Sequence, residues 1–413
     1  MSKWEWKKLG DLYPIVMGKT PPRGDPSCWD KSKRTNNVWV TIADISSNEN
    51  QVITESKEYI SDKATKNISL VSPKSLLLSF KLSIGKMAFA GVPLYTNEAI
   101  VNFPPIKDID LHYLHKYFLY YNWDKASEGD TKVKGKTLNK EKLKNIDIPI
   151  PPLSEQKRIV KFLDEEFSKI ETLKTNAETN LKNAKELFET TLEKELNPLS
   201  RHSERSEESS ADLPSGWEWK KLGDLFKMVR GPFGGSLKKE CFKKEGHPVY
   251  EQQNAIYSKF EFRYFIDDKK FEEMSRFRVE PGDFIMSCSG TMGKVAIVPP
   301  ESSVGIINQA LLKMSPQKGI ISTYAKYYMM NSSFVDSLLK NAQGVAIKNV
   351  AAVKELKLIP FALPPLSVQK EIVSRLDKLS ENVKRLEANY KQIIANCDEL
   401  KKSILKKTFE GES

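Results

Sequence analysis

The chain has 413 residues, of which 39% are hydrophobic and 29% charged, and this length predicts about three structural units. Its four cysteines form no C-x-x-C pair, which argues against a disulfide framework and a cysteine-based zinc site and favours a reducing, cytoplasmic environment. No apolar run approaches the roughly 18 residues of a membrane span, and the first residues lack the apolar stretch of a signal peptide.

The net charge of +11 is concentrated in two regions of equal length. Residues 1–152 carry 23 basic and 17 acidic side chains, a balance of +6, and residues 214–365 carry 22 and 15, a balance of +7. An excess of positive charge suits an anionic partner such as a phosphate backbone.

The elements, in chain order, indicate two mixed domains. Short apolar runs at 75–80, 86–90, 283–287 and 294–298, bounded by glycine and proline, predict strands, whereas 111–121 and 323–339 predict helices. The segment 198–213 is almost wholly polar and predicts a flexible linker. We therefore expect an α+β fold with two tandem globular domains.

An internal repeat relates the two halves of the chain. The sequence WEWKKLGDL at 4–12 recurs unchanged at 217–225, and PPLSEQK at 151–157 matches PPLSVQK at 364–370, both at an offset of 213 residues. Between these ends the offset drifts, as Gly85-Lys86 matches Gly293-Lys294 at 208. The outer frames of the two halves thus agree, and their middles diverge.

Each half ends in a tail with helical periodicity. In the second tail, apolar residues alternate in steps of four and three from Ile372 to Ile404, which predicts a heptad seam. The first tail has a broader and weaker stripe over the equivalent positions. Pro-Pro stops the preceding strand in each case, and Ser154 and Ser367 are expected to cap the helices that follow.

A helix of about 44 residues is about 66 Å long, and its apolar seam needs a partner. The economical partner is the other tail, packed antiparallel, so that residues 408–410 return beside the first domain with pseudo-two-fold symmetry. The alternative is that each tail forms a coiled coil with another molecule.

Enzyme motifs are missing from both halves. Gly18-Lys19-Thr20 has Tyr13 where a nucleotide-binding loop needs its first glycine, and the turn at 290–294 has the wrong glycine spacing. His112 and His115 have a spacing that could bind metal but lack a third ligand nearby. The sequence therefore predicts no catalytic residue and no metal site.

What remains is recognition by loops rich in side chains that bind bases and phosphates. On loop chemistry alone, the candidate DNA-binding residues are Lys19, Arg23, Lys33, Arg34, Asn36, Asn37, Lys132, Lys134, Lys136, Arg230, Lys238, Lys239, Gln252, Gln253, Asn254, Thr291, Gln343 and Lys348.

The chain resembles the specificity subunit of Type I restriction-modification systems. The resemblance covers nearly all of the chain and rests on the repeated WEWKKLGD, on PPLSxQKxIV opening each helix, and on the turn at 287–294. The first half has Leu82 where the second has Gly290, which leaves the shape of that turn open in the first half.

The resemblance implies target recognition domains at 1–152 and 214–365, long helices at 153–197 and 366–413, and a linker at 198–213. It further implies a non-catalytic subunit that recognises a bipartite site in double-stranded DNA. Two methyltransferase subunits, which use S-adenosylmethionine, and optionally two ATP- and Mg-dependent restriction subunits would bind the cofactors, and this chain would bind none. The alternatives are a coiled-coil assembly protein whose basic domains bind protein or RNA, and a self-contained methyltransferase, which the missing motifs disfavour.

Overall fold

A computed structural model of the protein describes residues 4–126, 131–132, 135–136, 138–197, 213–233, 235–340 and 352–410, with the backbone alone at 131–132, 135–136 and 339–340. The chain divides into two compact units. Unit 1 comprises residues 1–177 and 392–413, and unit 2 comprises residues 178–391. Within the described ranges, no helix has both the length and the apolar composition needed to cross a membrane.

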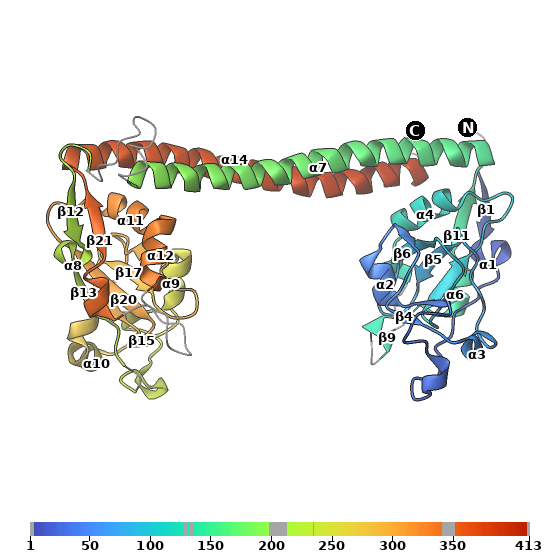
Figure 1. The fold of residues 1–413 in the computed structure, drawn as a ribbon, viewed down its shortest axis with the longest axis horizontal. Helices are drawn as coiled ribbons and strands as arrows, with labels where there is room; N and C mark the ends of the chain where they lie inside the picture. Colours follow the sequence, from blue (N-terminus) through green and yellow to red (C-terminus); the bar gives the residue numbers. More distant parts are fainter. Residues whose placement is uncertain are drawn as a thin grey trace. The chain divides into compact units, whose positions relative to one another are not determined.

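Unit 1 contains a mixed domain of short strands and helices (Figure 1). Its elements, in chain order, are β1 (Glu5–Lys8), α1 (Leu9–Leu12), η1 (Pro26–Cys28), β2 (Val38–Val40), α2 (Ile42–Ser47), β3 (Val52–Ile53), β4 (Glu58–Tyr59), α3 (Asp62–Thr65), β5 (Leu76–Ser79), β6 (Met87–Ala90), β7 (Leu94–Thr96), β8 (Ile100–Phe103), α4 (Leu111–Tyr120), α5 (Trp123–Ala126), β9 (Thr131–Lys132), β10 (Gly135–Lys136), α6 (Lys140–Lys144) and β11 (Asp147–Ile150).

The central sheet of unit 1 has the strand order β3-β6-β5-β8 and is covered on both faces. All four side chains of β5 are buried, which explains why this strand has a continuous apolar sequence rather than an alternating one. Leu76 and Leu78 pack in the cluster that contains α4. Leu77 points the other way, into the cluster with β2 of the second sheet, β4-β2-β7. The predicted strands and the predicted helix of this domain are confirmed to within one residue at each end.

Unit 2 repeats this plan with different details. Its elements are β12 (Glu218–Lys221), α8 (Leu222–Leu225), β13 (Phe226–Arg230), η2 (Lys239–Cys241), β14 (His247–Tyr250), α9 (Gln252–Tyr257), β15 (Phe265–Ile266), α10 (Asp268–Glu273), η3 (Ser275–Phe277), β16 (Arg278–Val279), β17 (Phe284–Ser287), β18 (Val295–Ile297), β19 (Gly305–Ile307), β20 (Leu311–Pro316), α11 (Ser322–Met330), α12 (Ser332–Lys340), α13 (Val353–Leu356) and β21 (Pro360–Leu363). Two four-stranded sheets, β13-β20-β17-β18 and β15-β14-β19-β16, form its core.

The single helix expected over 323–339 is wrong, because the structure has two helices there. Helix α11 ends at Met330, and α12 begins at Ser332. Asn331 lies between them with 4% of its surface exposed, and its side-chain Oδ1 accepts a hydrogen bond from the Phe334 amide at 2.7 Å. An asparagine that caps the following helix competes with continuation of the preceding one.

The two long helices are α7 (Leu153–Leu196) and α14 (Leu366–Glu410). Both begin one residue before the serines that we expected to cap them, so Ser154 and Ser367 lie inside the first turn. Instead, a buried glutamine ties each helix to its domain. Gln156 donates to the Asp108 and Pro151 carbonyls at 3.0 and 2.9 Å, and its Oε1 accepts from the Asp110 amide at 2.8 Å.

The same brace occurs in unit 2. Gln369 donates to the carbonyls of Gly319 and Pro364 at 3.1 and 2.9 Å and accepts from the Ile321 amide at 2.8 Å. Both glutamines are fully buried, and their hydrogen bonds match one for one. The repeated PPLSxQK sequence therefore forms the same set of hydrogen bonds at the start of each long helix.

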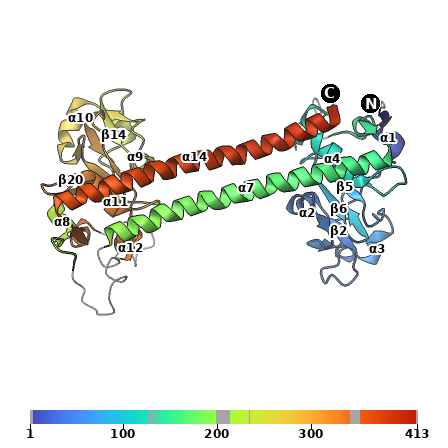
Figure 2. The same ribbon diagram turned by 90° about the horizontal axis from the view of Figure 1, so that it is seen from above.

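The two helices pair antiparallel within each unit. In unit 1, Lys174 and Lys401 form ion pairs with Asp398 and Glu171, at 3.0 and 2.7 Å, so the residue numbers rise on α7 as they fall on α14. The last turns of α14 lie beside the first half of α7 in Figure 2. In unit 2, Arg375 pairs with Glu195 at 2.7 Å. The expected antiparallel packing is confirmed in both units.

The buried stripe of these helices has a period of eleven residues rather than seven. In α14, the positions Ile372, Val383, Ile394 and Leu405 are buried or half-buried, and in α7 the equivalent stripe contains Ile159, Ile170, Leu181 and Leu192. Eleven residues in three turns is close to the natural twist of an α-helix. The expected heptad seam is therefore wrong at Leu386 and Leu400, which are 38% and 46% exposed.

Candidate nucleic-acid interface

Three loops of unit 2 meet at one end of the sheet β13-β20-β17-β18. Arg230, the last residue of β13, pairs with Leu312, and Ser287, the last residue of β17, pairs with Leu311. The Cys288 amide then donates to the Ala310 carbonyl at 2.9 Å. The loops after β13 and β17 and the turn before β20 are thus neighbours, and they bring the predicted residues Arg230 and Thr291 to the same sheet end.

A glycine allows the loop after β13 to cross the neighbouring turn. A Cβ atom at Gly231 would lie 1.8 Å from the Asn308 carbonyl oxygen, so no other residue fits there. Unit 1 has the same crossing, because a Cβ atom at Gly18 would lie 2.0 Å from the Thr96 carbonyl oxygen. The loops that begin at Gly18 and Gly231 therefore start at equivalent places, where the two glycine amides donate to the carbonyls of Ile100 and Leu311.

The turn between β17 and β18 is held by Ser287. Its Oγ accepts from the Lys294 amide at 3.0 Å, and its carbonyl accepts from the Gly293 amide at 2.8 Å. Gly290, in the middle of the turn, has φ +63°. Thr291 follows it and is exposed.

The corresponding turn of unit 1, between β5 and β6, has the same backbone. Ser79 accepts from the amides of Lys86 and Gly85 at 3.1 and 2.9 Å. Leu82 has φ +63°, the same value as Gly290. The turn of unit 1 therefore keeps the same conformation although it has Leu82 where unit 2 has Gly290.

Gln252 and its neighbours in α9 extend the sheet end of unit 2. The Gln252 amide Nε2 donates to the Ser289 carbonyl at 2.5 Å, in the same turn as Thr291, while its Oε1 is buried without a hydrogen-bond partner. Gln253 is half-buried, and its amide contacts Glu251 at 3.4 Å.

Asn254 has a different role from the one predicted. Only 1% of its surface is exposed, its Oδ1 accepts from the Glu251 amide at 2.7 Å, and its Nδ2 donates to the Lys259 carbonyl at 2.6 Å. These bonds fix the start of α9 and the loop after it. A side chain so enclosed does not present its amide to an external ligand.

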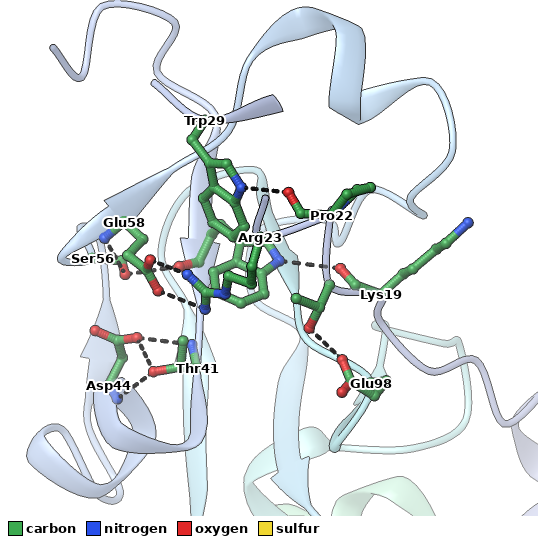
Figure 3. A network of polar contacts seen from close by, with 11 residues as sticks. Lys19, Pro22, Arg23, Trp29, Thr41, Asp44, Ser56, Glu58 and Glu98 are labelled. Carbon is green, nitrogen blue, oxygen red and sulfur yellow. Dashed lines mark hydrogen bonds and ion pairs between the residues drawn. The ribbon is translucent and has the colours of Figure 1, made fainter. Parts of the chain in front are cut away.

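Arg23 of unit 1 lies in an ordered aromatic site (Figure 3). Its guanidinium is 4.2 Å from the centre of the Trp29 ring and 4.8 Å from that of Trp39, and it forms a two-pronged ion pair with Glu58. The hydrogen bonds that Arg23 donates to Glu58 raise the pKa of the guanidinium above its usual value. The positive charge of Arg23 is thus held in one orientation.

Lys19 is exposed beside this site. Its carbonyl accepts from the Trp39 indole at 3.2 Å, so the backbone of the Gly18 loop is tied to the same aromatic group. Thr20 next to it donates to Glu98, and this hydrogen bond lowers the pKa of the Glu98 carboxyl.

The loop after Trp29 carries four predicted residues. Lys33 donates to the Ser56 carbonyl at 2.9 Å, Asn37 donates to Asp62 at 2.8 Å, and Arg34 and Asn36 are exposed. An open pocket of about 300 Å³ lies between this loop and β4, lined by Arg23, Pro26, Trp29, Asp30, Lys31, Lys57, Glu58 and Tyr59.

The remaining predicted residues are not brought to either sheet end by the described contacts. Lys238 and Lys239 are exposed near η2, in a segment whose Lys243 pairs with Phe265 of the other sheet. Lys132 and Lys136 lie on the hairpin β9-β10, of which the backbone alone is described. Lys134, Gln343 and Lys348 lie outside the described residues.

Sequence reasoning missed Trp29, Glu58 and Ser289. Trp29 and Glu58 carry a usable signal, because an aromatic residue and an acidic residue often accompany an ordered arginine. In a sequence, however, an aromatic side chain beside an arginine cannot be distinguished from one in the core. Ser289 takes part through its carbonyl, which no residue type reveals.

The family model described as Type I restriction modification DNA specificity domain matches residues 1–183 and 214–395, one match for each half of the repeat. The Type I restriction enzyme MjaIX specificity subunit of Methanocaldococcus jannaschii is 30% identical over 237 residues, which is 55% of this chain and 52% of that protein. The EcoBI specificity subunit of Escherichia coli is 22% identical over 287 residues, 67% and 60% of the two chains. The aligned part thus spans about half to three-fifths of these relatives.

Solved structures have the same fold. A chain from a structural study of complex assembly and conformational transition of the type I R-M system has a TM-score of 0.77 at 19% identity, covering 100% of this chain and 99% of that one. The HsdS subunit from Thermoanaerobacter tengcongensis has a TM-score of 0.61 at 17% identity, with 100% and 98% covered. With both halves matched by the family model, this chain belongs to the family of Type I restriction-modification DNA specificity proteins.

Proposed function

We propose that this chain is the DNA-reading subunit of a Type I restriction-modification complex, in which each unit recognises one half of a bipartite duplex site. The observation that carries the proposal is the match between the two sheet ends. The amides of Gly18 and Gly231 donate to the carbonyls of the equivalent residues Ile100 and Leu311, and Leu82 and Gly290 share a φ of +63°, yet the side chains of these loops differ. A common frame with different side chains suits two readers of the same kind of ligand that have different sequence preferences.

Charge and loop chemistry support duplex DNA as the ligand. The two globular regions carry +6 and +7, which favours contact with phosphates, and Arg230, Gln252 and Thr291 can hydrogen-bond to base edges. The other basic candidates, Lys19, Arg34, Lys132, Lys134, Lys136, Lys238, Lys239 and Lys348, are proposed as phosphate contacts. Asn254 is left out because it is buried.

Two linked readers bind more tightly than either alone, because the second contact becomes intramolecular once the first has formed. We infer that the paired helices set the separation between the two half-sites. Methyl transfer would then be carried out by two methyltransferase subunits that bind S-adenosylmethionine, with optional ATP-dependent restriction subunits.

Repeated exposed apolar residues support two copies of one partner. Trp6 and Trp219, equivalent in the repeat, are 56% and 48% exposed, and Leu153 and Leu366 at the starts of α7 and α14 are also exposed. Exposed tryptophan is enriched at protein interfaces. Because the loops diverge while these residues are kept in both halves, we propose that each Trp–Leu pair contacts a methyltransferase subunit.

The experiment that tests DNA recognition compares methylation across the genome in cells with and without this chain. One bipartite methylated motif should disappear when the chain is removed. In parallel, the chain purified with its methyltransferase subunit is used to select duplexes from a randomised pool. Unchanged methylation together with no selected duplex would contradict the proposal and favour the protein- or RNA-binding alternative.

The partner surface is tested by Trp6→Ala, Trp219→Ala and the double variant, co-expressed with the methyltransferase subunit. Native mass spectrometry should show one partner fewer for each single variant and none for the double variant. Trp39→Phe, a substitution inside the domain core, serves as a control that should retain both partners. Full assembly of the double variant would rule out this surface.

A further inference from the structure

Leu82 occupies a costly position in unit 1. Its φ of +63° lies in the left-handed region, where a side chain other than that of glycine clashes with its own backbone. Its side chain is also 56% exposed, so it gains little from burial. Among the described non-glycine residues with positive φ, the others are lysine, asparagine and serine, and Leu82 alone is apolar.

The second half of the chain shows that this turn does not need a leucine. Gly290 occupies the equivalent position with the same φ, and the hydrogen bonds of Ser287 match those of Ser79. Glycine takes this conformation without strain. Neither the turn nor the core therefore explains the leucine, which points to a role in contact with another molecule.

The surroundings of Leu82 indicate which molecule. The amide of Phe80, two residues before Leu82, donates to the Ala99 carbonyl at 3.0 Å, and the Gly18 amide donates to the next carbonyl, that of Ile100, at 3.3 Å. The Leu82 turn and the loop of Lys19 and Thr20 therefore start from adjacent points of the domain. Both segments are at the sheet end that we assign to DNA in the proposed function, on which this inference rests. A narrow two-stranded turn has the dimensions to enter the major groove.

We propose that Leu82 is a base-reading residue that contacts the 5-methyl group of a thymine in the major groove of the first half-site. Its side chain carries no hydrogen-bonding group, and the thymine methyl is the apolar feature that distinguishes one base from the others in that groove. At the equivalent position, Gly290 presents no side chain, and the amide of Gln252 lies close by instead, its Nε2 3.8 Å from where a Cβ of residue 290 would be. The two units would thus treat this position differently, one through an apolar contact and the other with no side chain on the turn itself.

The test uses the full chain with its methyltransferase subunit and a duplex selected from a randomised pool. Leu82→Gly keeps the turn, so its melting temperature should equal or exceed that of the original chain. Its affinity for the selected duplex should fall on the order of 10-fold, the size of a lost base contact, and preference should relax in the first half-site only.

Deoxyuridine in place of each thymine of the first half-site removes the methyl group alone. At one position it should weaken binding by the original chain on the order of 10-fold while leaving binding by Leu82→Gly unchanged. An equal loss in both proteins at every position would overturn the thymine contact. So would a loss of affinity in the variant with no effect of deoxyuridine, which would indicate that Leu82 acts as a wedge between bases.

Lys74→Gly is the matched control. Lys74 also has a positive φ, +67°, but lies before β5, at the opposite end of the strand from Leu82. Its replacement should leave the sequence preference of the first half-site unchanged. If the original chain itself selects no duplex, the proposed function fails; if it selects one and Leu82→Gly selects the same one with equal affinity, this inference alone fails.

Discussion

The ring of Phe409, near the end of the last helix, stacks on the ring of Tyr120 at the end of α4, with centroids 5.5 Å apart and planes inclined by 28°. Glu410 accepts a hydrogen bond from the Tyr120 hydroxyl at 2.7 Å. Leu405 and Phe409 belong to the same buried cluster as the α4 residues Tyr113 and Phe118. The end of α14 is therefore part of the core of the first domain.

Phe409→Ala should destabilise unit 1 by about 3–5 kcal/mol, the usual cost of removing a buried aromatic ring. The measurement is urea unfolding followed by tryptophan fluorescence. Lys407→Ala, at an exposed position of the same turn, should leave the midpoint unchanged. Equal midpoints for Phe409→Ala and the original chain would mean that α14 does not contribute to this core.

Gln369→Leu removes three hydrogen bonds from a fully buried side chain. Because the Ile321 amide and two carbonyls lose their partner, the free energy of unfolding should fall by about 3–5 kcal/mol. Chemical denaturation of the variant measures this loss, and Lys370→Leu on the exposed face of the same turn is the control. A loss no larger than that of the control would show that water replaces the glutamine.

Arg230→Ala tests the sheet end of unit 2. Arg230 lies close enough to Cys288 for its charge to oppose the effect of burial, which raises the pKa of that thiol to about 11. We expect DNA affinity to fall by about 10- to 100-fold. The dependence of binding on salt then separates two roles: a phosphate contact lowers the slope by about one, whereas a base contact changes the preference in the second half-site. Unaltered affinity and preference would remove Arg230 from the interface.

His115 makes the stability of unit 1 depend on pH. Burial lowers the pKa of this histidine to about 4, and its Nε2 contacts the Asn50 side chain at 2.7 Å. Since the unfolded chain binds a proton near pH 6.5 and the folded one only near pH 4, the stabilisation is complete above pH 6.5 and is lost as the pH falls from 6.5 to 4.

The free energy of unfolding should fall by about 3 kcal/mol between pH 6.5 and pH 4 because of His115. Urea unfolding of the original chain and of His115→Gln, followed at several pH values, isolates it from the titration of carboxylates. The difference between the two proteins should shrink as the solution is acidified. A difference that stays constant between pH 7 and pH 4 would contradict a buried neutral imidazole.

The eleven-residue stripe allows the proposed spacing function to be tested by insertion into both helices, near Ala177 in α7 and near Gln392 in α14. Eleven added residues keep the buried stripe in register and add about 16 Å, or about half a turn of DNA. Twenty-two residues add about 33 Å, or about one turn. We expect the shorter insertion to abolish specific binding and the longer one to restore it on sites whose spacer is about 10 base pairs longer. Selection from a randomised pool reads out the spacer, and an unchanged spacer with either insertion would contradict the spacing function.

Much of the architecture was predictable because it repeats. The strands around Leu76 and Phe284 are apolar runs bounded by turn residues, and the helices after the Pro-Pro pairs have long apolar stripes. The single helix expected over 323–339 was wrong because the side chain of Asn331 interrupts a continuous helical pattern. The heptad seam was wrong at Leu386 because a seven-residue and an eleven-residue repeat differ by only a fraction of a residue per turn. Heptad and eleven-residue patterns agree over two turns and separate only over the length of the helix.

The candidate site was less predictable from sequence because the type of a residue does not determine how far its side chain is exposed to solvent. Arg23 and Asn254 are both polar loop or helix-start residues, yet one is ordered on a surface between tryptophans and the other is enclosed. Leu82 is chemically a core residue that lies on a turn tip. Its significance depends on a backbone angle and on the comparison with Gly290, and the sequence contains only the second of these.

The first and last strands of each globular part are paired. Glu5 lies opposite Ile150 in β1 and β11, and Glu218 lies opposite Leu363 in β12 and β21. The second globular part therefore starts and ends at adjacent points, Glu218 and Leu363, which lie in or next to the shared sequences at 217–225 and 364–370. Genetic recombination at these two shared sequences would exchange the second globular part as a unit and leave the Gln369 brace in place.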